Sequence, residues 1–326
     1  MRRTIRHLSV ALVLIAAGIA IAKAETYPSR PITIVVPYPA GGPTDTLARI
    51  LTDHMNRSLG QPLIIENVAG AGGSVGVGRV ARATSDGYTV SIGHWNTHVV
   101  LGATMDLSYD VLNDFAPVAL LADTPIWMVA RTTLPPKDLV ELVAWLKQNP
   151  GRVTAGTVGV GGAGDLAGAY FQGVTGTKFL FVPYRGAAPM MQDLLAGHID
   201  INLGMAAASY PLVRNGKIKA HGTMAKSRWW AAHDVPTMEE AGVPGLYASF
   251  WHGLWVPKGT PEDVIVKLNT AVRSALAHPG VRKQMADQGQ EIPPSEQQSP
   301  QALRTLQQSE IEKWWPIIKV AGIRAY

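Results

Sequence analysis

A serine within a glycine-rich segment is the first candidate for chemistry in this 326-residue sequence. Residues 72–76 read G-G-S-V-G and match G-x-S-x-G, the nucleophile elbow in which a serine attacks an acyl carbon. Asp200 and His221 follow in the order of a catalytic triad. An elbow requires a strand that runs straight into the serine, whereas residues 67–73 separate Ser74 from the strand expected before it. A secreted serine hydrolase using Ser74 is therefore kept only as the alternative hypothesis.

The pattern G-x-G-x-x-G at 159–164 is typical of dinucleotide binding, which also needs an acidic residue at the end of the next strand to hold the ribose. The strand expected there ends near Arg185, without a carboxylate. His94 and His98 are spaced like zinc ligands on a helix, but the glutamate and third ligand of such a site are missing. Cysteine is absent, which excludes disulfides and thiolate sites. The sequence predicts no cofactor and no metal.

Two glycine loops share one design, each between the first strand and the first helix of its half of the chain. They are residues 37–45, P-Y-P-A-G-G-P-T-D, and residues 159–165, G-V-G-G-A-G-D. Such a loop presents free backbone N–H groups and the positive end of a helix dipole, which together bind anions. Because ligands of open α/β sheets bind at the carboxyl ends of strands, the two loops are expected to face each other across a cleft. Ordinary tight turns are the alternative for each loop.

Alternating strands and helices are needed to position these loops. Apolar runs rich in β-branched and aromatic residues predict strands, and apolar residues at helical spacing predict helices. The expected strands are 32–36, 63–66, 88–92, 153–157, 179–182, 199–203 and 218–224, and the expected helices are 44–59, 74–84, 165–174 and 187–196. This alternation predicts parallel sheets with helices on both faces, in two α/β units.

The C-terminal part, 262–278 and 300–321, is expected to be helical and to return to the first unit. The chain would then cross between the units near 123–127 and 250–256. These crossings are apolar and aromatic, which is typical of hinge strands rather than of flexible linkers. We therefore expect an α/β protein with two hinge crossovers, in which lobe 1 is 25–124 plus 254–326 and lobe 2 is 125–253.

A basic start followed by an apolar run opens the chain. Residues 1–24 hold four basic and no acidic side chains, and their uncharged run 8–22 leads into A-K-A, the pattern of a cleavable signal peptide. The run is short for a membrane span of about 20 residues. We predict a signal peptide at 1–24 and a location outside the cytoplasm. Without it the basic residues fall from 29 to 25 against 24 acidic ones, so the formal net charge falls from +5 to +1. Nucleic acid is therefore not expected as a partner.

Short motifs in a fixed order carry a specific resemblance. They are 27–32 (YPSRPI), 36–45 (VPYPAGGPTD), 66–73 (ENVAGAGG), 86–89 (DGYT), 182–186 (VPYRG), 197–200 (GHID) and 256–261 (VPKGTP). Together they span the chain after the leader. In these motifs the sequence resembles Bug-type (TctC-type) periplasmic solute receptors of the tripartite tricarboxylate transporter system.

The resemblance implies a two-lobed periplasmic-binding-protein (Venus-flytrap) fold, no catalysis and no cofactor. It also implies a small organic carboxylate in the interlobe cleft, delivered to the membrane permease subunits of the transporter, and we expect a monomer in the periplasm. The ligand-binding residues that it implies are Tyr38, Ala40, Gly41, Gly42, Thr44, Asp45, Asn96, Thr97, Thr157, Gly161, Gly162, Ala163, Asp165, Tyr184 and Arg185.

The second loop departs from the family pattern. It reads G-G-A-G-D at 161–165, where the family usually has a serine or threonine hydroxyl, and Asp165 places a carboxylate where an anion is expected. The side chain of Asp165 has three alternative roles. It caps its helix while turned away from the ligand, it repels a second ligand carboxylate, or it pairs with a ligand amine. The departure argues against a ligand charged at both ends, such as citrate.

Overall fold

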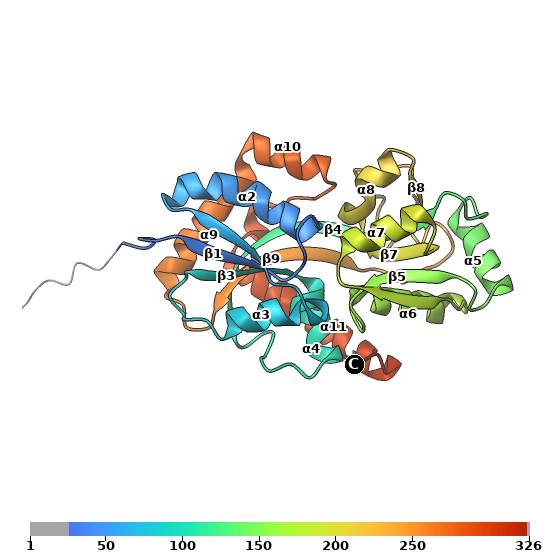
Figure 1. Cartoon of the computed structure of the whole chain (residues 1–326), viewed down its shortest axis with the longest axis horizontal. Coiled ribbons are helices and arrows are strands. Elements are labelled where there is room, and N and C mark those ends of the chain that lie inside the picture. Colours follow the sequence, from blue (N-terminus) through green and yellow to red (C-terminus); the bar gives the residue numbers. More distant parts are fainter. Residues whose placement is uncertain (1–25, 325–326) are drawn as a thin grey trace, which may run out of the picture.

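The computed structural model describes residues 26–324, so the predicted signal peptide at 1–24 lies outside the described residues. The chain forms two α/β lobes joined by two long strands (Figure 1). Across residues 26–324, no helix combines the length and the apolar character needed to span a membrane.

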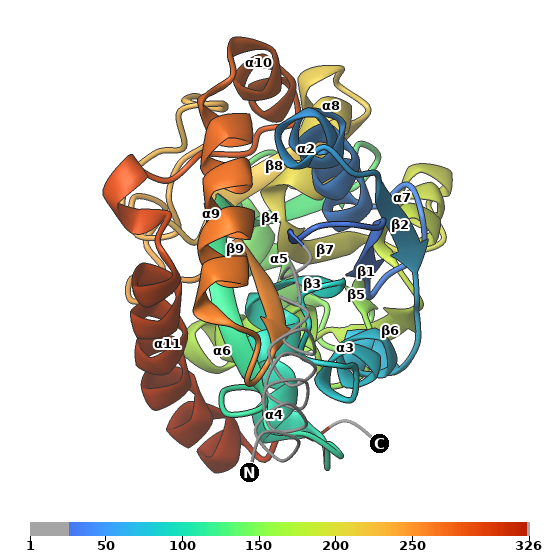
Figure 2. The ribbon, with the colours of Figure 1, turned by 90° about the vertical axis from the view of Figure 1, so that its left-hand side faces the viewer.

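Lobe 1 is built on a five-stranded sheet. In spatial order its strands are β2 (Leu63–Asn67), β1 (Ile32–Val36), β3 (Thr89–His94), β9 (Ser249–Pro257) and β4 (Phe115–Arg131). The helices of this lobe are α2 (Pro43–Leu59), α3 (Ser74–Ala81), α4 (Leu101–Thr104), α9 (Glu262–Ala277), α10 (Pro279–Asp287) and α11 (Pro300–Ala321). Figure 2 looks onto this lobe, with α9 and α11 beside the sheet.

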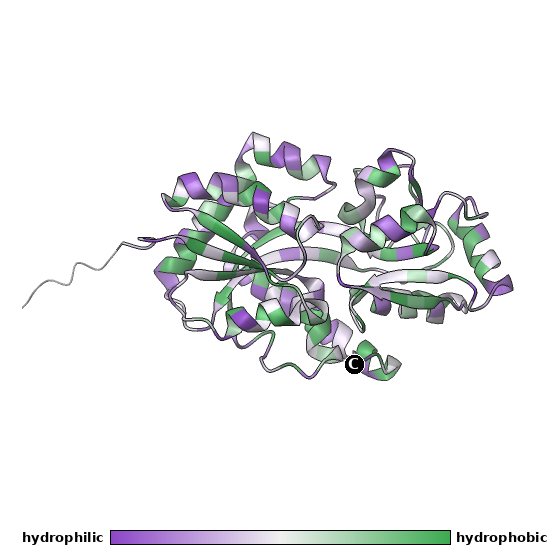
Figure 3. Cartoon of the chain, in the orientation of Figure 1, coloured by the Kyte–Doolittle hydropathy of each residue, from purple (hydrophilic) through white to green (hydrophobic). Residues whose placement is uncertain are grey.

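Alternation along β1 assigns these helices to the two faces of the sheet. Ile32, Ile34 and Val36 are buried in one cluster with the apolar stripes of α2 and α9. Val35 points to the other face, where it is buried in a cluster that includes Val77 of α3. The sheet is therefore covered on both sides, and Figure 3 shows mostly hydrophobic strands between helices with hydrophilic outer faces.

Lobe 2 repeats this arrangement around β4, which belongs to both sheets. Its strands are β5 (Thr154–Val158), β6 (Leu180–Tyr184), β7 (Ile201–Met205) and β8 (Ile218–Thr223), in the order β4-β7-β5-β6, with β8 paired to the other edge of β4. Its helices are α5 (Leu139–Gln148), α6 (Ala163–Thr175), α7 (Ala187–Ala196) and α8 (Ala206–Arg214).

The prediction of parallel sheets is wrong for part of each sheet. Strands β2, β1 and β3 are parallel, as are β6, β5 and β7, but β9 is antiparallel to β3 and β4, and β4 is antiparallel to β7 and β8. The reason is the hinge. The long strand β4 leaves lobe 1 and β9 returns beside it in the opposite direction, so neither strand is a link of a βαβ unit.

Both predicted crossings lie in these hinge strands. Residues up to Pro125 of β4 pair with β9, and from Ile126 the same strand pairs with β7. The strand β9 begins at Ser249, opposite Pro125. The two-lobed architecture with two hinge crossovers thus follows from the pairing, whereas the lobe boundaries at 125 and 253 stay a prediction.

Candidate functional site

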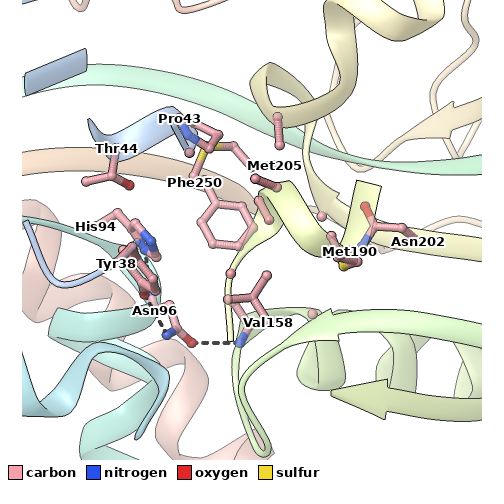
Figure 4. Close-up of a pocket in the computed structure, with 18 of the residues that line it drawn as sticks. Tyr38, Pro43, Thr44, His94, Asn96, Val158, Met190, Asn202, Met205 and Phe250 are labelled. Atoms are coloured by element: carbon pink, nitrogen blue, oxygen red, sulfur yellow. Dashed lines mark hydrogen bonds between the residues drawn. The ribbon is translucent and has the colours of Figure 1, made fainter. Parts of the chain in front are cut away.

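A cavity of about 80 Å³ lies between the lobes. One water molecule needs about 10–15 Å³ measured this way, so the space suits a compact molecule of the size of roughly five to eight waters. Figure 4 shows side chains from both lobes around it. The wall comprises Tyr38, Pro39, Gly42, Pro43, Thr44, His94, Asn96, Val158, Ala163, Gly164, Gly186, Ala187, Ala188, Met190, Asn202, Leu203, Gly204, Met205, Ala208 and Phe250.

Four helices begin at this cavity. The first turns or N-caps of α2, α6, α7 and α8 all contribute wall residues, among them Thr44, Ala163, Ala187 and Met205. Each helix N-terminus carries a partial positive charge on amides that have no partner within the helix. No Asp, Glu, Lys or Arg appears among the wall residues of the part of the chain that the structure describes. The wall therefore favours an anion through backbone dipoles rather than through a charged side chain.

The side chain of Asp45 holds the first glycine loop in shape through hydrogen bonds. Its side chain is 3% exposed and accepts hydrogen bonds from Gly41 N (2.9 Å), Asn67 Nδ2 (3.0 Å) and both Nε and Nη2 of Arg49 (2.9 and 3.0 Å). Burial raises the pKa of this carboxyl, but the bonds from Arg49, Gly41 and Asn67 outweigh it and hold the pKa below its ordinary value. Gly41 has φ +84°, a conformation that favours glycine.

Asp165 does the same for the second loop. Gly161 N donates to Asp165 Oδ2 at 2.6 Å, the same four-residue spacing as Gly41 and Asp45. Burial is the main cause that raises the pKa of Asp165. Neither aspartate is on the cavity wall. The expectation that the amides of Gly41 and Gly161 are free for a ligand is therefore wrong, because each donates to its own loop.

Asn96 connects the two lobes. It lies in the π-helical turn Asn96–Val100 that follows β3, and its Oδ1 accepts a hydrogen bond from Ala163 N at the start of α6 (2.7 Å). Its Nδ2 donates to Tyr38 Oη (3.2 Å) and to the carbonyl of Gly72 (3.1 Å). Other loops also meet here: a Cβ placed on Gly159 would lie 2.9 Å from the Cα of Gly72. The lobes are closed on each other.

Hydrogen-bond partners set the polarity of two side chains on the lobe 1 wall. Asn96 N donates to Nδ1 of His94 (3.1 Å), so the neutral ring carries its hydrogen on Nε2. Nε2 of His252 lies 3.1 Å from Thr44 Oγ1, while its buried Nδ1 has no partner in the described chain. Because an orphaned N–H costs more than an orphaned lone pair, Nε2 carries the hydrogen and donates to Thr44. The Thr44 hydroxyl hydrogen is then available to a ligand.

His94 on this wall and two further buried histidines, His98 and His252, have pKa values that burial lowers: that of His94 falls well below 6.5, and those of His98 and His252 fall to about 3. They are therefore neutral at physiological pH. His98 stacks on Trp255 with ring centroids 3.6 Å apart.

These values predict a pH dependence of stability. Between about pH 3 and pH 6.5 the unfolded chain binds a proton at His98 and the folded chain does not, so acid lowers the free energy of unfolding. His98→Asn keeps a polar atom near Thr97 but removes this proton site. Between about pH 6.5 and pH 5 the wild type should lose about 2 kcal/mol relative to the variant. Denaturant unfolding of both proteins measures this, and parallel pH curves would contradict it.

The structure divides the predicted ligand-binding residues into two groups. On the cavity wall lie Tyr38, Gly42, Thr44, Asn96 and Ala163. Away from the wall lie Ala40, Gly41, Asp45, Thr97, Thr157, Gly161, Gly162, Asp165, Tyr184 and Arg185. Several of these hold the loops: Thr97 Oγ1 bonds both backbone groups of His94, and Tyr184 Oη donates to Asp193.

Most of the wall on the lobe 2 side was not predicted. Met190 comes from α7, and Asn202 and Met205 come from β7; Phe250, which was not predicted either, comes from β9 in the lobe 1 sheet. His94, at the end of β3, is also on the wall. For the others no local pattern was available, because ordinary strand and helix residues reach the cavity only through the packing of the two lobes.

The catalytic patterns do not assemble. Ser74 begins α3 in lobe 1, whereas His221 is on β8 in lobe 2 with no hydrogen-bond partner for either ring nitrogen in the described chain. Asp200 instead accepts from Arg131 and Thr154. The serine hydrolase alternative is therefore not supported. Within residues 26–324 no group of three or more His, Asp or Glu side chains could hold a metal ion.

Comparisons with known proteins show the family and the fold of this chain. A family model described as "Tripartite tricarboxylate transporter family receptor" matches residues 47–323. Protein BugT of Bordetella pertussis is 34% identical over 323 residues, which cover 98% of each chain. The structure of MatC from Rhodopseudomonas palustris with bound malate is 38% identical, with a TM-score of 0.86 over 90% of this chain and 100% of that one. R. palustris Rpa4515 with adipate is 32% identical, with a TM-score of 0.87 over 91% and 99%.

Proposed function

This chain belongs to the tripartite tricarboxylate transporter receptor family, and on that premise we propose that it is a non-enzymatic periplasmic receptor for a small organic carboxylate. The observation that carries the proposal is the convergence of four helix N-termini on a cavity whose described wall has no charged side chain. Such a wall attracts one anion. Carboxylates are also the ligands named for two of the similar structures, malate and adipate.

The ligand carboxylate is proposed to sit against the lobe 1 wall. There it accepts from the Thr44 hydroxyl, from His94 Nε2 and from free amides at the start of α2. Lobe 2 then closes over the ligand, with Ala163 and the starts of α7 and α8 completing the wall. A ligand bound by both lobes stabilises the closed state because it contacts both only when they meet.

The family supports a proposal for the biological setting. We propose that a signal peptide at 1–24 directs the chain to the periplasm, that the mature protein is a monomer, and that it delivers its ligand to the membrane permease subunits of a tripartite transporter. Asp45 and Asp165 have no direct contact with the ligand in this proposal; they hold the two glycine loops in shape.

A thermal-shift screen of small organic acids, followed by calorimetry, tests this function. At least one acid should raise the melting temperature, because a ligand that binds only the folded state stabilises it by mass action. Thr44→Val should weaken that binding about tenfold, since it removes one hydrogen bond to a charged group while keeping the shape. Thr270→Val on the exposed face of α9 is the matched control. If no acid binds, or if the protein turns the acid over, the proposal is wrong.

A further inference from the structure

Asn202 is a buried polar side chain on the lobe 2 wall whose orientation is fixed. It is 2% exposed and comes from β7. Its Nδ2 donates to the carbonyl of Gly156 (2.8 Å) and lies 3.4 Å from the sulfur of Met190. Because a carbonyl oxygen can only accept, the amide nitrogen must face Gly156. The atom left over is Oδ1, an acceptor.

The space over this oxygen is kept open by a glycine. Gly204 is also on the wall, and a Cβ placed on it would lie 2.9 Å from Asn202 Oδ1. Asn202 Oδ1 accepts no hydrogen bond from the part of the chain that the structure describes. This acceptor gains a hydrogen bond when a bound molecule supplies a donor. The geometry thus provides a place for a donor beside Asn202.

The neighbours of Asn202 on the wall offer no other polar side chain. Met190, Met205 and Val158 lie on this side of the cavity, whereas Phe250 of β9 packs against His94, and Figure 4 shows Asn202 and Met190 opposite Tyr38, His94 and Thr44. The two sides therefore differ in their side chains: the lobe 1 side presents donors, and on the lobe 2 side, beside the backbone at the starts of α6, α7 and α8, Asn202 presents one acceptor among apolar side chains. A second carboxylate at Asn202 would place oxygen against oxygen, without a cation to offset the repulsion.

Resting on the proposed function, we propose that Asn202 selects carboxylates whose far end carries a hydrogen-bond donor, such as a primary amide or a hydroxyl, over dicarboxylates. The carboxylate binds the lobe 1 donors, a short apolar body lies against Phe250 and the methionines, and the donor pairs with Asn202 Oδ1. The ligand is thereby oriented across the cleft, and the stability of the closed state depends on the chemical group at its far end.

The test compares dicarboxylates with their own monoamides, which have nearly the same shape. Calorimetry measures the affinities of succinate, glutarate and adipate against succinamate, glutaramate and adipamate. For the chain length that fits, the monoamide should bind roughly tenfold more tightly than the diacid. Asn202→Leu, which has a similar size, should reduce this ratio to about twofold or less, whereas Asn215→Ala on the exposed end of α8 should leave it unchanged.

A second variant keeps the proposal testable if Asn202→Leu fails to fold. Gly204→Ala keeps the asparagine but puts a methyl group over its oxygen, and it should lower the monoamide affinity more than the diacid affinity. If the wild type binds a diacid as tightly as its monoamide, the role of Asn202 is refuted while the receptor function stands. If neither member of any pair binds and the acid screen is also negative, the receptor function itself fails.

Discussion

Asn96→Ala is expected to weaken ligand binding by roughly 30- to 100-fold and to shift the protein toward an open conformation. The side chain is 3% exposed and makes three hydrogen bonds, one of which joins the lobes through Ala163 N. Alanine removes all three and leaves the amide of Ala163 without its partner in the closed state. The closed state is destabilised by about 2–3 kcal/mol relative to the open state, and ligand affinity falls with the fraction of molecules that can close.

Small-angle scattering with ligand and calorimetry measure these two effects. Asn96→Asp separates the two sets of bonds, since its carboxylate can still accept from Ala163 N but cannot donate to Tyr38 or Gly72. It also adds a negative charge beside a site for anions, so it should bind a carboxylate no better than Asn96→Ala. Asn113→Ala, in an exposed turn, is the matched control. Unchanged affinity in Asn96→Ala would mean that this contact does not couple closure to binding.

Local patterns were sufficient to predict most elements of the fold. The stripe of Leu47, Leu51 and Met55 predicted α2, and the run 32–36 coincides with β1. Such residues act through their own neighbours, either by alternation or by helical spacing, so one sequence reveals them. The direction of a strand in its sheet, in contrast, is not predicted by neighbouring residues. Whether β9 runs with or against β3 depends on where the chain re-enters lobe 1, which no window of residues contains.

The residues of the candidate site divide in the same way, into those that a local pattern predicts and those that only tertiary packing brings to the cavity. Tyr38, Gly42 and Thr44 lie on a loop whose composition itself predicts an anion site, and they line the cavity. Asn202 and Met205 look like any residues of a buried strand, and only the packing of β7 between β4 and β5 brings them to the wall. The loop pattern also led to one wrong prediction. It predicts free glycine amides, but it does not reveal that an aspartate four residues later takes one of them.

This internal aspartate implies that the glycine loops are held in shape before any ligand arrives. Gly41 and Gly161 both have positive φ, at +84° and +66°, and both donate to an aspartate in the first turn of the next helix. Each hydrogen bond fixes a conformation that a free glycine would leave easily. A loop ordered in advance loses less entropy on binding, which strengthens the affinity for the anion. The aspartates therefore act on binding without touching the ligand.

Asp45→Ala should lower the free energy of unfolding by about 3 kcal/mol and reduce binding of any carboxylate ligand to below detection. The buried side chain accepts from Gly41, Asn67 and Arg49. Its removal leaves Gly41 N without its partner and Asn67 Nδ2 with only its bond to the Tyr38 carbonyl. Loop 37–45 then loses the bond that holds Gly41 at positive φ, and the start of α2 no longer has a fixed place on the cavity wall. Denaturant unfolding and calorimetry measure the two losses.

The pH dependence distinguishes this account from a general loss of packing. Hydrogen bonds hold the pKa of Asp45 below its ordinary value of 3.8, so its contribution to stability is present above that pH and is lost as the pH falls through the lower, folded-state value. The stability difference between wild type and Asp45→Ala should therefore shrink in acid. Asp53→Ala on the same helix, an aspartate with no side-chain hydrogen bond in the described chain, is the matched control. A difference that stays constant down to about pH 3 would show that Asp45 acts through packing and that its charge does not hold the loop.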